Sequence, residues 1–583
     1  MSNYPPPTTE YPAMGYPNTV IVVTQAQVPV ITSQSKILDR SLFTRKEYLI
    51  LCAGVLIQAF MYSFEVNLMY NALGYVTGYF TASSIATILP VILQIISAAL
   101  VPLYTKVSDV FGRAESLTAA MVLYLVGYAI QGNSQAFAHL AIGQIFYGMG
   151  STGMLTLTQV LIADTTKLIN RGIMFSLWDL PSAINIFTTQ VLADPMTIPK
   201  GDDPKDKWRQ VYLTVGVLSL VGAIAVLVPL WYLQRKAERK APQVHQRRSL
   251  MWLLHEFDVV GALLITLAMS LTLLPMILAK SFQGNWENPS ILGMFFSGIF
   301  FFILLILWEA KYTDKPIMSM KIWSNPTAFG GLVVCMMMTV MAAMNWQYFT
   351  LYLVVSRNLS FGDALMLERG YQVAYLVFQF ITALMMKRWN ITRPFVWIGI
   401  FIHTAGIGMM IPARLPTSSD ALVVISQTIV GAAGGMANIA SNVLVTGVVA
   451  KKDVATVVGA TQIMGSFGSA FGAALAGGVW TQYLPTRLAK HITGPYDEYL
   501  SMNDPLTYIP GLDPTTKAQL VEAYSDSQLL MSIISCALAV TACGCALMMK
   551  PIDLHADQPD DEPEATGAIV MDENLVDGKI EVK

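Results

Sequence analysis

Four ionisable side chains lie inside long apolar stretches of the sequence, where a charge is expensive. On insertion scales, one such group at the centre of a bilayer helix costs about 2.5–3.5 kcal/mol. They are Glu65, Asp179, Glu368 and His403, and Glu65 has the most apolar and aromatic neighbours, in FMYSFEVNLMY. Titratable groups in such places mark proton relays and ion pathways. We therefore take Glu65 as the first proton-coupling candidate and the other three as weaker ones.

Each of these groups also has an ordinary structural explanation. Glu65 could be solvated at a helix end, and His403 could be a packing residue on an apolar helix. Asp179 could cap its helix or pair with Arg171. Glu368 and the adjacent Arg369 lie near the external end of their predicted helix, where they could form ion pairs with neighbouring residues or contact a substrate directly.

Neutral polar and aromatic side chains in the same stretches could bind a bulky, nearly neutral ligand through amides, hydroxyls and rings. Buried amides also hold helices together, so each residue has a packing alternative. The substrate-binding candidates are Gln58, Tyr62, Asn67, Tyr70, Gln144, Tyr147, Gln159, Asn345, Trp346, Gln347, Tyr348, Tyr352, Gln427, Asn438, Asn442 and Gln462.

The elements that carry these residues are membrane helices. Of the 583 residues, 54% are hydrophobic and only 13% are charged, against about 25% charged in ordinary soluble domains. Backbone polar groups in hydrocarbon must be satisfied within the segment, so the spans are helices. We expect an all-α integral membrane protein with fourteen spans near 48–70, 84–104, 115–132, 135–162, 172–192, 210–233, 257–279, 290–310, 326–354, 364–386, 394–412, 421–448, 455–480 and 527–549.

Several functional classes do not fit this composition. A net charge of −2 gives no reason to expect nucleic-acid binding. The five cysteines all lie in apolar stretches and predict neither disulfides nor a metal site. No phosphate-binding loop, nucleophile elbow or zinc-hydrolase motif occurs. We expect no resident cofactor and no enzymatic activity.

The distribution of basic residues predicts the orientation. Most of the 36 Lys and Arg residues fall on one side of the membrane if both tails are cytosolic, as the positive-inside rule requires. The tail 1–46 is rich in Pro, Tyr and Thr, and we expect it to be disordered. The acidic tail 551–583 lacks apolar periodicity, and we expect it to be a solvated end.

An internal repeat divides the chain. QIFYGMGSTGMLTLTQVLIA from Gln144 aligns without gaps to QTIVGAAGGMANIASNVLVT from Gln427, and the same register brings four more helix pairs together. Parallel repeats are typical of transporters whose two halves surround a midplane site. The predicted domains are a first half, a linker with two extra helices, and a second half that includes a long external loop. Their bounds are 47–233, 234–324 and 325–550, with the loop at 481–526.

One loop carries a recognisable motif. YTKVSDVFGRAES resembles the major facilitator loop motif, which Asp109, Gly112 and Arg113 match. Thr105, Val110 and Ala114 depart from it. Asp109 and Arg113 could pair across the two halves and lock one conformation.

Further segments narrow the resemblance over roughly 38–550. IADTTKLINRG follows the fourth span, LLHEFDVVGALL opens the seventh, and KPIMSMKIWSNPTAF opens the ninth. With the predicted 6 + 2 + 6 arrangement, the chain resembles the fungal siderophore-iron transporter family of the major facilitator superfamily. We add Asp164 and Arg171 of the first of these segments to the conformational gate. The family loop implies an external gate formed by Tyr483, Tyr496, Tyr499 and Tyr508.

The resemblance implies a monomeric, proton-coupled symporter that imports ferric siderophores of the hydroxamate type by alternating access. Iron would travel only as part of the siderophore. Similar proteins import haem, exchange glutathione for protons or export toxins, and these alternatives stay open. A siderophore receptor without transport activity is an alternative of another class. The implied location is the plasma membrane, with both termini cytosolic and possible endosomal cycling.

Overall fold

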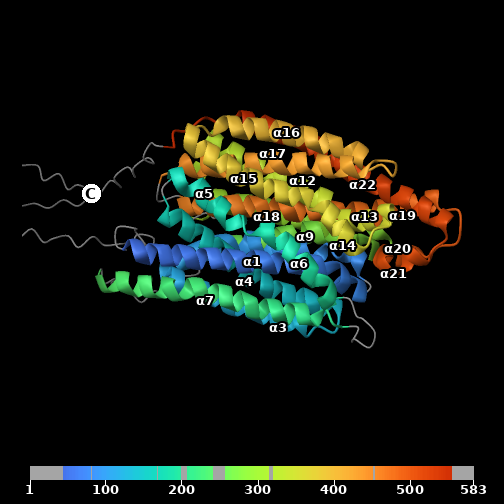
Figure 1. Ribbon diagram of the computed structural model, residues 1–583, viewed down its shortest axis with the longest axis horizontal. Coiled ribbons are helices and arrows are strands. Elements are labelled where there is room, and N and C mark those ends of the chain that lie inside the picture. The colour runs from blue at the N-terminus through green and yellow to red at the C-terminus, as the bar shows by residue number, and fades with distance from the viewer. Residues whose placement is uncertain are drawn as a thin grey trace, which may run out of the picture.

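The computed structural model is almost wholly helical (Figure 1). It describes residues 44–80, 82–166, 168–197, 206–240, 257–281, 283–313, 320–450 and 454–554. The predictions about most of both tails lie outside the described residues, as does part of the predicted linker, 241–256.

The first half contains α1 to α7. Their bounds are α1 (Arg45–Tyr79), α2 (Ile88–Phe111), α3 (Arg113–Gly132), α4 (Phe137–Thr165), α5 (Leu168–Asp179), α6 (Ser182–Thr197) and α7 (Arg209–Lys240). The linker contributes α9 (Val259–Leu278) and α10 (Pro289–Lys311).

The second half begins after the short α11 (Met320–Ser324). It contains α12 (Pro326–Trp346), α13 (Phe349–Arg357), α14 (Phe361–Glu368), α15 (Gly370–Trp389), α16 (Arg393–Ala413), α17 (Asp420–Gly447), α18 (Val454–Gly478) and α22 (Pro514–Leu547). We call the end of the bundle where α1 begins and α22 ends the tail end. The opposite end, which carries residues 484–513, is the loop end (Figure 1).

Twelve helices of the described residues are long and apolar enough to cross a membrane. The fifth predicted span is broken into α5 and α6 at Leu180 and Pro181. The tenth is broken between α14 and α15, and neither piece is among the twelve. The all-α fold is confirmed, whereas the count of fourteen spans stays a prediction.

The segment 481–526 is mostly helical, although we expected a loop. A π-helical turn (Val479–Tyr483) carries α18 into α19 (Leu484–His491), and the short α20 (Glu498–Asn503) and α21 (Pro505–Tyr508) follow. Helix α22 begins with Pro514 at its first turn and Asp513 as its N-cap, a combination that favours helix initiation. Hydrogen bonds from Thr515 and Thr516 hold the pKa of the Asp513 carboxyl below its usual range.

The two halves repeat the same helix neighbours. In the first half α4 packs on α2 and α3, while α1 packs on α6 and α7. In the second half α17 packs on α15 and α16, while α12 packs on α18 and α22. The register that aligns residues 144 and 427 therefore relates helices with equivalent surroundings.

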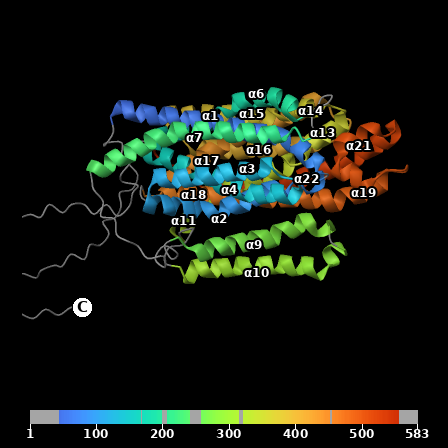
Figure 2. The ribbon, with the colours of Figure 1, turned by 90° about the horizontal axis from the view of Figure 1, so that it is seen from below.

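The halves meet along a seam formed mainly by α2 against α18 and by α5 against α15. The linker helices lie to one side of this bundle (Figure 2). Helix α9 packs on both α2 and α18, whereas α10 packs on α9 and is mostly exposed. The linker therefore covers one side of the seam between the halves.

Candidate functional site

Glu65 lies in the interior of the first half and is only 1% exposed. Its carboxylate accepts hydrogen bonds from the Tyr128 hydroxyl of α3 and from the Ser219 hydroxyl of α7, the latter at 2.6 Å. The solvated helix-end alternative for Glu65 is therefore wrong.

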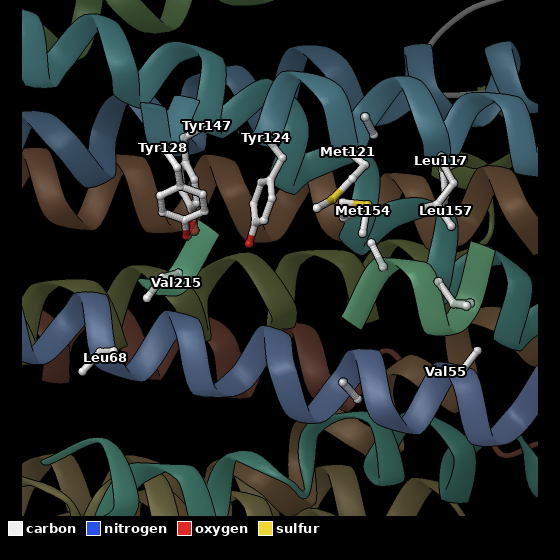
Figure 3. Close-up of a cluster of buried hydrophobic side chains, with 14 of the residues drawn as sticks. Val55, Leu68, Leu117, Met121, Tyr124, Tyr128, Tyr147, Met154, Leu157 and Val215 are labelled. Carbon is white, nitrogen blue, oxygen red and sulfur yellow. The ribbon is translucent and has the colours of Figure 1, made fainter. Parts of the chain in front are cut away.

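Three tyrosines surround this carboxylate. Tyr124, Tyr128 and Tyr147 pack ring against ring, with centroids 5.1–5.3 Å apart. Figure 3 shows all three hydroxyl groups pointing toward α1, the helix of Glu65. We call this group the tyrosine cage. A cavity of about 10 Å³ lies beside Glu65, lined in part by Gln58, which is about the space that one water molecule needs. The arrangement offers hydroxyl groups and space for a water, through which a proton could reach the carboxyl.

The centre of the seam is polar and neutral. Gln462 of α18 donates to Gln159 of α4 and accepts from Thr156 at 2.7 Å. Ser466 of α18 donates to Ser97 of α2 at 3.0 Å. Two predicted substrate residues from opposite halves thus lie in direct contact, at a place that must separate whenever the halves move apart.

Asp179 also bridges the halves. Gln379 of α15 donates to its carboxylate at 2.8 Å, and the Ser176 hydroxyl donates to the Gln379 carbonyl at 3.4 Å. Arg171, which we considered as the partner of Asp179, instead donates to the Thr446 carbonyl at 3.5 Å. Asp179 therefore faces the second half.

At the loop end, two adjacent residues of the first half contact two adjacent residues of the second half. The Tyr70 hydroxyl of α1 donates to Glu368 at 2.6 Å, and the Arg369 guanidinium donates to the Asn71 side chain. Arg369 also lies over the Tyr70 ring, 5.1 Å from its centroid. We call these four residues the loop-end clamp. Glu368 is thus engaged with α1, and the substrate role considered for it would require the clamp to open.

The tail end has its own contacts. Arg113 pairs with Asp109 at 2.9 Å and with Asp164 at 3.1 Å, and it donates to Ser108. All of these residues belong to the first half, so the expected pairing of Asp109 and Arg113 across the halves is not what the structure contains. Arg171 is the gate residue that reaches the second half. Gly112, between α2 and α3, has φ = 116°, a conformation that glycine adopts easily.

The two aspartates around Arg113 differ in exposure, which gives a testable difference in stability. Asp164 is 16% exposed and Asp109 is 38% exposed, and solvent screens the more exposed pair more strongly. We expect Asp164→Asn to lower the thermal unfolding temperature of the purified protein more than Asp109→Asn does. Fluorescence-monitored melting in one detergent checks this, and an equal or larger shift for Asp109→Asn would contradict it.

The remaining first-half candidates sit within that half. Asn67 donates to Ser182 of α6 at 2.9 Å, and Gln144 accepts from Gln131 at 2.6 Å. The Tyr62 ring lies 6.1 Å from that of Trp178. These contacts fix the helices of the half, and they match the packing alternative for buried amides.

The second-half candidates divide between internal packing and the seam. Asn345 accepts from Ser532 at 3.0 Å, Trp346 donates to Gln427 at 3.2 Å, and Tyr352 donates to the Arg414 carbonyl at 2.6 Å. Asn442 donates to Asn438 at 3.3 Å. Besides Gln462, whose contacts across the seam are described above, Tyr348 also reaches the first half, where its hydroxyl donates to the Thr87 hydroxyl at 3.4 Å. Gln347 is the C-cap residue of α12, and its backbone N–H donates to the Ala343 carbonyl.

His403 is 2% exposed on α16, and its Nδ1 has no hydrogen-bond partner among the described residues. It lies in the core of the second half, beside Gly434. Glu65, Asp179, Glu368 and His403 thus occupy four separate places.

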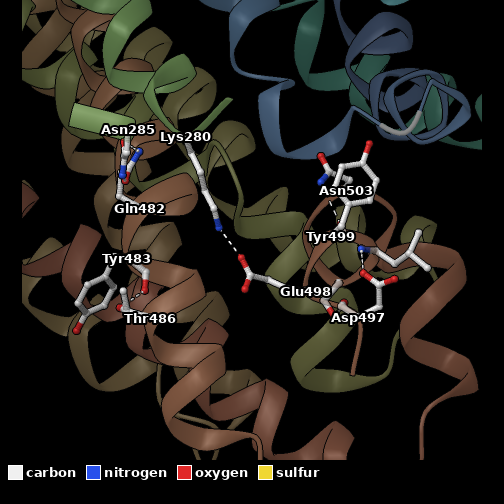
Figure 4. Close-up of polar contacts among 11 residues, drawn as sticks. Lys280, Asn285, Gln482, Tyr483, Thr486, Asp497, Glu498, Tyr499 and Asn503 are labelled. Carbon is white, nitrogen blue, oxygen red and sulfur yellow. Dashed lines mark hydrogen bonds and ion pairs between the residues drawn. The ribbon is translucent and has the colours of Figure 1, made fainter. Parts of the chain in front are cut away.

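The four tyrosines expected as an external gate are spread along residues 483–508. Tyr483 accepts from Arg487, Tyr508 accepts from the backbone of Asp497 at 2.7 Å, and Tyr499 is 60% exposed. Burial, followed by the nearby Glu498, raises the pKa of Tyr496. Figure 4 shows the neighbouring contact that ties this segment to the linker, Lys280 with Glu498 at 2.5 Å.

Several contact residues did not stand out in the sequence. Tyr124 and Tyr128 look like packing residues on an apolar helix, yet their spacing of four places both on one face, toward Glu65. Ser219 and Thr156 carried no signal of their own, because short hydroxyl side chains are common in membrane helices.

The fold and the polar seam define a two-halved membrane transporter, and the comparisons agree. The chain matches the Major Facilitator Superfamily over residues 55–367 and 335–495, and it belongs to that superfamily. It is therefore a multi-pass membrane protein.

Its relatives confirm the resemblance to fungal siderophore-iron transporters. It is 27% identical to the siderophore iron transporter mirC of Emericella nidulans over 471 residues, 79% of this chain and 76% of that protein. It is 23% identical over 510 residues to siderophore iron transporter 1 of Saccharomyces cerevisiae, 84% of this chain and 80% of that protein.

Solved structures support the fold alone. A bacterial homologue of the human lysosomal transporter Spinster, in an inward-facing and occupied conformation, has a TM-score of 0.53 at 12% identity and covers 86% of this chain and 96% of its own. The proton:xylose symporter XylE has a TM-score of 0.50 at 12% identity and covers 84% of this chain and 96% of its own.

Proposed function

We propose that this protein imports ferric siderophores of the hydroxamate type together with protons. The observation that carries the proposal is the similarity, over about four fifths of the chain, to proteins named as siderophore iron transporters. The neutral amides and hydroxyls at the centre of the seam support it, because a near-neutral ligand is recognised by hydrogen bonds and aromatic surface rather than by net charge.

Transport would proceed by alternating access of the two halves around the seam. The loop-end clamp would open to admit the ligand, Gln159 and Gln462 would exchange their mutual bond for ligand contacts, and the tail-end contacts would then part. Glu65 would carry the proton, since it is buried, ionisable and surrounded by hydroxyl groups. The protein would act as a monomer in the plasma membrane with both termini in the cytosol.

Uptake of radioactive iron tests this function. The protein is expressed in a fungal strain that lacks its own siderophore carriers and is offered iron on a panel of hydroxamate siderophores, with and without a protonophore. We expect accumulation of at least one complex that the protonophore abolishes. Surface labelling of a tagged protein is the control for expression, and empty vector gives the background.

The alternative functions predict other results in the same cells. Accumulation of haem but of no siderophore would replace the proposed substrate. Protonophore-sensitive loss of preloaded glutathione or toxin would replace import by export. Siderophore binding at the surface without accumulation would identify a receptor.

A further inference from the structure

The last turns of α7 form a groove that the transport function does not use. Its volume is about 700 Å³, and its lining includes Leu227, Val228, Trp231, Tyr232, Arg235 and Arg239. It lies at the tail end, where α7 runs along α1 (Figure 1). The lining residues that the structure describes are apolar, then aromatic, then cationic in chain order, and none of these described residues is a carboxylate.

This order continues an exposed stripe along the helix. Leu213, Val217, Val221, Ile224 and Val228 recur every three or four residues and are 49–64% exposed. A stripe of this kind on a membrane helix faces lipid tails. Tyr232 is 58% exposed at the position where the aromatic belt of a membrane protein meets the headgroups. The groove is therefore continuous with a lipid-facing surface.

The cationic part of the groove is held in place. Trp231 donates to Thr118 at 3.1 Å, which fixes its ring, and the Arg235 guanidinium lies 5.0 Å from the ring centroid. Lys236 is neutralised by Glu47 of α1. Arg235 and Arg239 are both exposed and lie one helical turn apart, a spacing of about 6 Å along the axis.

The distances match those of a membrane interface. Arg235 lies seven positions after Val228, a rise of about 10 Å along the helix at 1.5 Å per residue. A headgroup layer is about 5–8 Å deep on each side of a hydrocarbon core of about 30 Å. Acyl chains beside Leu227 and Val228 would thus place a headgroup phosphate beside Arg235.

We propose that this groove binds one anionic phospholipid of the leaflet at the tail end. Its acyl chains lie along Leu227 and Val228, and its phosphate and carboxylate contact Arg235 and Arg239. Guanidinium groups suit such anions because they present several donors in a planar fork. A zwitterionic lipid offers the same chains but no net negative charge for the two cations.

Native mass spectrometry of the full-length protein in mild detergent tests the proposal. The protein is mixed with equal amounts of phosphatidylserine and phosphatidylcholine. We expect one tightly retained phosphatidylserine in the wild type and its loss in R235Q/R239Q. We expect R235K/R239K to keep much of it, because the charges remain. Melting temperature and elution profile show whether each variant is folded.

Two controls separate a built site from general attraction. K387Q/R388Q removes two exposed positive charges at the end of α15, also at the tail end, and should leave the retained lipid unchanged. Glycerophosphoserine, the headgroup without chains, should fail to displace it. Retention of the lipid by folded R235Q/R239Q, an equal loss in K387Q/R388Q, or displacement by the free headgroup would each overturn the proposal.

Discussion

Glu65→Gln is expected to abolish accumulation of the substrate against its gradient while leaving exchange across the membrane intact. A potential of about 100 mV is worth about 2.3 kcal/mol for each charge moved, which corresponds to a concentration ratio of about 40 at 1.4 kcal/mol per factor of ten. Glutamine keeps the size of the side chain and can still accept a hydrogen bond from Ser219, but it carries no titratable proton.

The measurement compares two assays in the same vesicles. Net accumulation under an imposed proton gradient should fall to the level of simple equilibration, whereas exchange of labelled for unlabelled substrate should continue. Glu65→Asp retains a carboxyl group and should keep part of the accumulation. Normal accumulation in Glu65→Gln would exclude Glu65 as the coupling residue and direct attention to Asp179, which bridges the seam.

A bulky side chain introduced between the halves at the loop end, by the substitution Gly74→Trp, is expected to hold the seam open on that side and to stop transport. A Cβ atom on Gly74 of α1 would lie 2.5 Å from the Phe361 ring of the second half, closer than two carbon atoms can approach. A Gly74→Trp side chain must therefore displace the Phe361 ring, and because an indole is much larger than a Cβ atom we expect it to separate α1 from α14 and to pull apart the neighbouring loop-end clamp. Gly78→Trp is the matched control, because the nearest atom to its Cβ is 3.9 Å away.

Thiol labelling shows which side has opened. With the five native cysteines replaced, a Ser466→Cys probe at the centre of the seam is treated with an impermeant reagent from outside the cell. Gly74→Trp should increase labelling and reduce uptake to background, and Gly78→Trp should do neither. Gly172→Trp should have the opposite effect on labelling, because its Cβ would meet Val443 at 3.1 Å near the tail end. Normal uptake by Gly74→Trp would contradict alternating access through this seam.

The sequence predicted the helical architecture well because long apolar segments in lipid have few alternatives to helix. It also predicted the relation between the halves, since α4 and α17 align residue by residue and have equivalent neighbours. The helical start at Pro514 was readable from Asp513 and the proline, but the many polar residues of 481–526 favoured a loop. Outside the hydrocarbon core of the bilayer, the hydropathy of the sequence does not indicate where a helix begins or ends.

Contacts between helices were harder to predict, because hydropathy in a membrane protein says little about which face meets which neighbour. Glu65 was correctly identified as a costly residue, but its partners Tyr128 and Ser219 come from helices far away in sequence. Arg113 and Asp109 were expected to join the halves, yet Asp164 of the same half lies within reach. The sequence thus identified the charged residues more readily than the helices that supply their contacts.

The linker helices make the two sides of the seam mechanically unequal. Because α9 packs on α2 and on α18, any rotation of one half relative to the other must shear these contacts, while the side formed by α5 and α15 lies away from that brace. The side formed by α5 and α15 should therefore open first, and lateral pressure from the surrounding bilayer would act mainly on that side. Bilayer thickness and tension would then influence the turnover rate without any change in the residues that contact the substrate.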